Sequence, residues 1–158
     1  MTSTWHALLT LAFATALGSS PLGALGQSAA ACPGPDEIEA VHLYGLWQLS
    51  LWAEEGQPAA PVTRGVVLFE RHPDYPGGVR GLLRLTETER PQQAQVSGDV
   101  ADGLFTLDES ADGVRMSAVW EGVPEDCGRR IRGSRRPAEG QADQPTRLFR
   151  LERSRGWD

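Results

Sequence analysis

The segment Gln93-Ala-Gln-Val-Ser-Gly-Asp-Val-Ala-Asp-Gly-Leu-Phe-Thr-Leu-Asp-Glu109 holds two alternating stretches on either side of an Asp-Gly dipeptide. Before the dipeptide, Val96 and Val100 alternate with polar residues. After it, Phe105 and Leu107 do the same. Alternation with a period of two is typical of a strand with one buried and one solvated face, and Asp-Gly supplies the positive-φ residues of a tight hairpin. The segment therefore predicts a β-hairpin with one face on a core.

Working outward from this hairpin, the same alternation recurs along most of the chain, punctuated by Gly, Pro and Asp. Eight strands are expected, over Leu46 to Ala53, Arg64 to Arg71, Val79 to Thr86, Gln93 to Val100, Leu104 to Glu109, Val114 to Glu121, Gly128 to Arg135 and Thr146 to Glu152. In the sixth of these, the buried face is expected to carry Val114, Met116, Ala118 and Trp120.

One or two helical turns are expected over Asp36 to His42, before the first strand, but no helix long enough to cover a sheet. Eight half-buried strands in series then close on themselves, which removes the exposed edges that would seed aggregation. The expected fold is all-β: an eight-stranded antiparallel up-and-down barrel with a short N-terminal helical turn.

Residues 1–31 are expected to be a secretory signal peptide, and residues 32–158 a single β-barrel domain. The uncharged apolar run from Ala7 to Leu17 is too short for a membrane-spanning helix, which needs ~20 residues. Small residues, Ser28-Ala-Ala-Ala31, follow it as in a cleavage region. No other segment is apolar enough to span a membrane, so the mature protein is expected in the periplasm or secreted.

The chain has two cysteines, Cys32 and Cys127. Two interpretations compete. In an oxidising compartment the pair closes into a disulfide bond with no thiol left over. Alternatively, Cys32 is the lipidated first residue of an anchored lipoprotein, although a lipobox usually has Leu where this chain has Ala29. We favour the disulfide.

The charge of the chain argues against nucleic acid and against anionic membranes as partners. Its 15 basic side chains are all Arg, and 21 acidic residues give a formal net charge of −6. Proteins that bind nucleic acid usually carry a basic excess that displaces phosphate counterions.

The tripeptide Gly45-Leu46-Trp47, after a short helical turn, resembles the Gly-x-Trp signature at the first strand of lipocalins. In that family an Arg of the last strand packs on the Trp, and Arg147 and Arg150 are the expected counterparts here. The short hairpins and repeated Trp also resemble avidins, another group of eight-stranded barrels, although the avidin set of polar ligand residues is not recognisable. Bacterial periplasmic lysozyme inhibitors, small disulfide-tied barrels, are similar in outline.

Four aromatic residues are candidate ligand-binding residues, because small-molecule pockets favour aromatic walls: Trp47, Trp52, Trp120 and Tyr75. Tyr75 belongs to the loop His72-Pro-Asp-Tyr75, which is expected to lie over the barrel mouth. The competing interpretation is that the tryptophans fill the core.

Other clusters of polar residues are expected to have structural roles. His72 and Asp74 are too few ligands for a metal site. Asp108, Glu109 and Asp112 are expected to be solvated residues of a turn. The Arg-rich stretch from Arg129 to Arg136 is expected to be a solvated strand with cross-strand acidic partners, in preference to the alternative of a polyanion site. No nucleophile–base arrangement, phosphate-binding loop or Cys-x-x-Cys is present, so neither an enzyme nor a cofactor is expected.

Together these features predict an exported, non-enzymatic binding protein of the lipocalin or avidin type, with a small apolar ligand or partner at the barrel mouth. The alternative is a periplasmic protein inhibitor that engages an enzyme through an exposed loop. A closed, dry core or a loop with a prominent side chain at its tip would favour the inhibitor.

Overall fold

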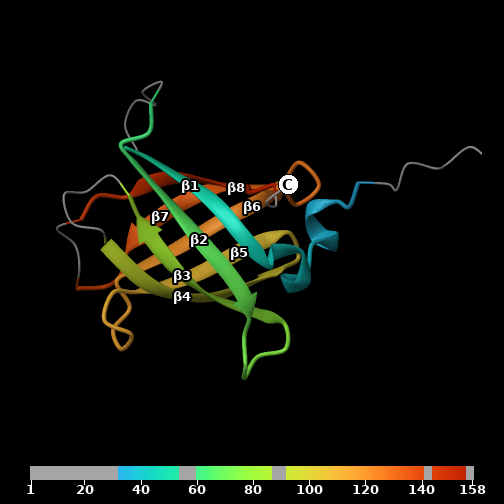
Figure 1. Cartoon of the computed structure of the whole chain (residues 1–158), viewed down its shortest axis with the longest axis horizontal. Helices are drawn as coiled ribbons and strands as arrows, with labels where there is room; N and C mark the ends of the chain where they lie inside the picture. The colour runs from blue at the N-terminus through green and yellow to red at the C-terminus, as the bar shows by residue number, and fades with distance from the viewer. Residues whose placement is uncertain (1–31, 54–59, 87–91, 141–143, 156–158) are drawn as a thin grey trace, which may run out of the picture. The chain divides into compact units, whose positions relative to one another are not determined.

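The computed structural model describes residues 32–53, 60–86, 92–140 and 144–155. The expected signal peptide, residues 1–31, lies outside the described residues. Eight antiparallel strands follow one another in sequence order and form a closed barrel, in which β8 pairs with β1 (Figure 1). The predicted fold class is confirmed. Across the described residues no helix is long and apolar enough to cross a membrane.

Two short 3-10 turns precede the barrel, η1 (Pro35–Glu37) and η2 (Ala40–Leu43). The strands are β1 (Gly45–Ala53), β2 (Thr63–Arg71), β3 (Gly78–Leu85), β4 (Gln92–Ala101), β5 (Leu104–Ser110), β6 (Ala118–Glu125), β7 (Arg130–Pro137) and β8 (Arg147–Arg153). Seven strands lie within two residues of their predicted bounds, because each begins or ends next to a Gly-, Pro- or Asp-containing turn that sequence alone reveals.

The sixth strand is the exception. It was expected over Val114 to Glu121 but begins at Ala118. The Asp112 carboxylate accepts hydrogen bonds from the backbone amides of Val114 (2.9 Å) and Arg115 (2.7 Å), which holds this segment in a bend. Val114 and Met116 therefore lie in the β5–β6 loop, 87% and 45% exposed, instead of on the buried face.

Alternation along the strands sorts side chains between the barrel interior and its outer face. In β1, for example, Trp47, Leu49 and Leu51 are buried, while Leu46 and Gln48 are exposed. The same parity holds along β2 and β5, where every second residue is buried. The core therefore lies inside the barrel.

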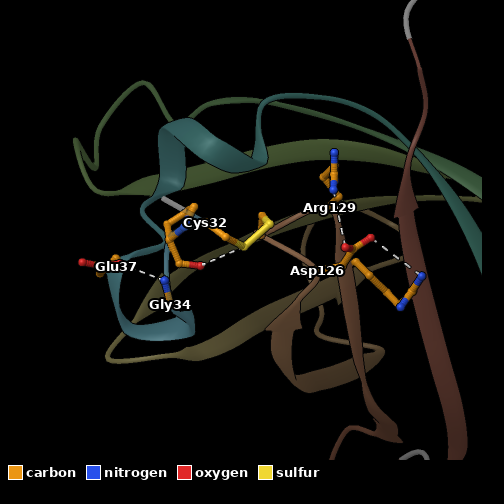
Figure 2. Close-up of a disulfide and its surroundings, with 8 residues drawn as sticks. Cys32, Gly34, Glu37, Asp126 and Arg129 are labelled. Atoms are coloured by element: carbon orange, nitrogen blue, oxygen red, sulfur yellow. Dashed lines mark hydrogen bonds and ion pairs between the residues drawn. A yellow bond between two sulfur atoms is a disulfide. The ribbon is translucent and has the colours of Figure 1, made fainter. Parts of the chain in front are cut away.

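The end of the barrel at which β1 begins is closed by the N-terminal segment. Ile38, Ala40 and Leu43, from η1 to η2, are buried against the core. A disulfide bond between Cys32 and Cys127 ties this segment to the β6–β7 turn, with 5.1 Å between the two Cα atoms (Figure 2). The predicted disulfide is confirmed. It fits an extracytoplasmic protein, and the same sulfur cannot also carry a lipid anchor.

Candidate functional site

The interior of the barrel, which holds two of the four candidate aromatic residues, is filled. Trp47 and Trp120 are 0% and 1% exposed. A series of ring contacts joins them, running from Trp47 through Phe69, Phe105 and Phe149 to Trp120, with centroid distances of 5.0 to 6.4 Å. The void among the described core residues next to Trp120 measures only about 10 Å³. That is about the space of one water probe, so no organic ligand fits beside these rings.

Trp47 has a structural role at the closed end of the barrel. Its indole Nε1–H donates to the carbonyl of Leu43 at 2.7 Å. The guanidinium of Arg153 lies over its ring, 5.9 Å from the centroid, and donates to the carbonyls of His42 and Tyr44. An Arg of the last strand therefore packs on Trp47, but it is Arg153 rather than the expected Arg147 or Arg150.

Register explains why Arg153 takes this place. Trp47 pairs directly with Arg153, whereas Arg147 pairs with Ala53 and Arg150 with Ser50. Gly45, with a φ of 121°, lies next to the Arg153 guanidinium: a Cβ there would be 3.7 Å from Nη2 and strained by its backbone conformation. Gly45 therefore stands beside the Arg153 guanidinium in a backbone conformation that favours glycine.

The opposite end of the interior holds a buried ion pair that sequence reasoning missed. Arg135 donates to both carboxylate oxygens of Glu109, from Nε and Nη2, each at 2.8 Å. The two side chains are only 11% and 8% exposed. Trp120 Nε1–H donates to the same carboxylate at 2.9 Å, and Ser117 Oγ at 3.2 Å. Glu109 is therefore not a solvated turn residue, and Arg135 does not lie on a solvated face.

The signal for this pair was present in the alternation. Glu109 shares the parity of Phe105 and Leu107, and Arg135 shares the parity of Ile131. Opposite charges at inward positions of two strands predict a buried pair. The Glu109–Arg135 pair lies at one end of the barrel interior and the N-terminal segment covers the other end, so the interior is closed.

A broad concave surface lies on the outside of the barrel. It is a groove of about 780 Å³ over the outer face of β5, β6, β7, β8 and the end of β1. We call this the outer groove; it is lined by Trp52, Leu104, Glu121, Gly122, Val123, Arg132, Gly133, Ser134, Leu148, Phe149 and Arg150. Leu104 and Val123 are 47% and 48% exposed, so apolar side chains stand open to solvent there.

Two glycines that face each other across β6 and β7, Gly122 and Gly133, form the floor of the outer groove. A Cβ at Gly133 would lie 1.8 Å from the Glu121 carbonyl oxygen. At Gly122 it would lie 2.8 Å from the Phe149 ring. Both glycines occupy inward positions of their strands, so they present peptide backbone to the groove, and the walls come from neighbouring outward residues.

Trp52 forms part of one wall of the outer groove. It points outward on β1, pairs with Leu148 on β8, and lies under the guanidinium of Arg150, 5.2 Å from the ring centroid. The stack holds indole and guanidinium together at the edge of the groove.

Tyr75 lies apart from both the interior and the outer groove. It is 67% exposed in the β2–β3 loop and packs against His72, with the two rings tilted and their centroids 4.6 Å apart. His72 Nδ1 accepts from the amides of Asp74 (3.1 Å) and Tyr75 (3.2 Å), which fixes the loop. The four candidate aromatics are therefore not brought together, and only Trp52 lines a groove large enough for a ligand.

The Arg-rich strand is largely as expected on its outer face. Arg132 pairs with Glu125 (3.3 Å), and Arg136 pairs with Glu121 (2.5 Å). Among the residues with described positions, no three His, Cys, Asp or Glu side chains gather closely enough to hold a metal ion.

Comparison of the sequence with models of known protein families and with curated proteins found no match. The closed eight-stranded antiparallel barrel is compatible with a calycin-like fold.

Proposed function

We propose that this chain is an extracytoplasmic, non-enzymatic binding protein that holds a small ligand with an apolar body in the outer groove, against Trp52. The observation that carries the proposal is the contrast between a void of about 10 Å³ inside the barrel and a groove of about 780 Å³ outside it. This moves the ligand from the barrel mouth, where sequence suggested it, to the outer face of the sheet.

The size and lining of the groove favour a small molecule. Ligand pockets typically measure ~300–1,000 Å³ and combine apolar walls with a few polar groups. The outer groove has such walls in Trp52, Leu104 and Val123. An extended peptide would have to bind without adding to a sheet, because the closed barrel offers no free strand edge.

The compartment is part of the same proposal. The disulfide supports an oxidising environment. Together with the expected signal peptide, it favours the periplasm or the extracellular medium. N-terminal sequencing of protein isolated from the host tests export: a chain that begins near Cys32 supports it, and an intact Met1 in reduced cytoplasmic protein contradicts it.

The binding test uses N-phenyl-1-naphthylamine, an uncharged fluorescent probe with an aromatic body. We expect it to bind the oxidised protein with a blue-shifted, enhanced emission, and Trp52→Ala to weaken binding about 10-fold or more, since truncating a central aromatic anchor typically costs that much. Leu68→Ala is the matched control, because Leu68 is an exposed apolar residue on β2, away from the groove. No binding, or equal binding by wild type and Trp52→Ala, contradicts the proposal.

One observation favours the second candidate, a protein inhibitor that acts through a loop. The β5–β6 loop presents Val114 at 87% exposure and is held by the Asp112 carboxylate, so an apolar tip is displayed on a fixed backbone. Such a preorganised tip reduces the entropy lost on docking. Because the chain is similar in outline to lysozyme inhibitors, inhibition of lysozyme by wild type but not by Val114→Asp would support this function; no inhibition by wild type would contradict it for that enzyme.

A further inference from the structure

Two arginines lie side by side in the wall of the outer groove. Arg132 of β7 and Arg150 of β8 are direct cross-strand partners, and both line the groove. Like charges directly opposite each other destabilise a sheet. An anion bound between the two guanidinium groups would relieve this repulsion.

Each of the two guanidinium groups has one carboxylate nearby, and the closest approach is at Nε in both cases. Glu125 contacts Arg132 through Nε at 3.3 Å, and Glu152 contacts Arg150 through Nε at 3.5 Å. Between residues that the structure describes, no hydrogen bond uses the terminal Nη groups of either arginine, and the closest approach in each ion pair is at Nε. A guanidinium has five N–H donors, so each retains donors for a further acceptor.

The acidic residue of the groove does not compete for these donors. Glu121 pairs with Arg136 at 2.5 Å. The stack on Trp52 orients the Arg150 plane, and a stacked guanidinium still presents its N–H edge to an oxyanion. The cationic pair and the apolar walls of Trp52, Leu104 and Val123 therefore belong to one groove.

We propose that the ligand of the outer groove is a small amphipathic oxyanion, whose carboxylate, sulfonate or phosphate group is held by Arg132 and Arg150 while its apolar body lies against Trp52. This rests on the proposed function and adds the charge of the ligand to it. The net charge of −6 makes a long polyanion a poor occupant, whereas a single oxyanion needs only the local cationic pair.

Two probes with the same aromatic body test the proposal: 1-anilinonaphthalene-8-sulfonate, which is anionic, and uncharged N-phenyl-1-naphthylamine. We expect the oxidised wild-type protein to bind the sulfonate about 10-fold or more tightly than the neutral probe, because charge-assisted hydrogen bonds add to the shared apolar contact. Arg132→Gln/Arg150→Gln should remove this preference, so that the affinities for the two probes come within about twofold of each other. Arg84→Gln, an exposed arginine of β3, is the control and should leave both affinities unchanged.

The outcomes separate the two proposals. Equal wild-type affinities for the two probes, or an equal loss of both in the double variant, overturn the oxyanion site while Trp52-dependent binding of the neutral probe leaves the proposed function standing. Absence of binding by either probe overturns both. Unchanged unfolding midpoints of the variants exclude dye binding to partly unfolded protein as the cause.

Competition then distinguishes the sources of the oxyanion. Octanoate, octyl phosphate and octanol have unbranched alkyl bodies of nearly the same length and are added against the bound sulfonate probe. Displacement by octanoate or by octyl phosphate at concentrations at which octanol has no effect supports the oxyanion site and identifies the head group. Equal displacement by all three contradicts it.

Discussion

Trp47 and Glu109 show how much individual side chains depend on the barrel around them. Trp47 is fully buried, and its indole N–H and ring face both have partners, Leu43 and Arg153. Glu109 is a charged residue that is only 7% exposed and has Arg135 as its partner. Trp47 stabilises the fold by burying apolar area. Glu109 is tolerated in the core because its charge is paired with that of Arg135.

Trp47→Ala is expected to lower the free energy of unfolding by ~3–5 kcal/mol, because burial is lost and a cavity remains under η2. Chemical denaturation should show a lower midpoint with a nearly unchanged slope. Trp52→Ala, at a half-buried outward position, provides the comparison and should cost clearly less. A near-neutral Trp47→Ala would be inconsistent with a buried indole.

Glu109→Ala is expected to cost ~3–5 kcal/mol, because it leaves the guanidinium of Arg135 buried without a counter-charge. Replacing both partners, in Glu109→Leu/Arg135→Met, should recover much of that loss, since no buried charge remains. The remaining deficit reflects Trp120 Nε1–H, which loses its acceptor. Additive losses across Glu109→Leu, Arg135→Met and the double variant would mean that the two groups are not coupled.

Among the elements, the β5–β6 connection departs furthest from its sequence pattern. Val114 and Met116 continue the alternation of β6, yet neither joins the strand. Ser110 and Asp112 explain the departure: Asp112 Oδ1 accepts from the Ser110 hydroxyl (3.3 Å) as well as from the amides of Val114 and Arg115. A carboxylate that satisfies backbone donors offers the chain an alternative to the sheet.

This loop should respond to pH in the acid range. The backbone amides of Arg115 and Val114 hold the pKa of Asp112 below its ordinary value of 3.8. A lowered folded-state pKa means that the carboxylate stabilises the loop fully above pH ~4 and loses this effect as the pH falls through the lowered value. Amide chemical shifts of Val114 and Arg115 should therefore titrate below pH 3.8, and Asp112→Asn should abolish the transition. A transition at or above that value would contradict the assigned hydrogen bonds.

Two long-range connections hold the whole molecule together, one by strand pairing and one by a disulfide bond. Pairing of β8 with β1 removes the last free edges, and the Cys32–Cys127 bond joins the N-terminal segment to the β6–β7 turn across 95 residues of sequence. Both connections join distant parts of the chain. The disulfide bond reduces the entropy of the unfolded state, whereas pairing of β8 with β1 forms only when the chain loses that entropy on folding.

Removal of the disulfide should therefore lower stability substantially. Cys32→Ala/Cys127→Ala is expected to lose ~2–5 kcal/mol, the range for closing a long loop in a small domain. Denaturation of wild type with and without reductant should give the same difference in midpoint. The double variant should be insensitive to reductant; a wild type that is equally insensitive would contradict a stabilising bond.

Periodicity and turn chemistry were enough to predict eight strands, a closed barrel and the pairing of the two cysteines. These features follow from local rules: alternation assigns faces, Asp-Gly and Pro mark turns, and an even cysteine count in an exported chain implies a bond. Even the Glu109–Arg135 pair could have been read from inward parity.

Contacts between strands distant in sequence decided which arginine packs on Trp47 and which residues form the outer groove. Arg153 rather than Arg147 or Arg150 packs on Trp47 because register between β1 and β8 depends on closure of the whole barrel. Likewise, the outer groove brings Trp52 of β1 next to residues of β5 to β8, about 50 to 100 positions away in the chain. Alternation says that a side chain points outward, but only packing of the complete sheet determines which outward side chains share a concave surface.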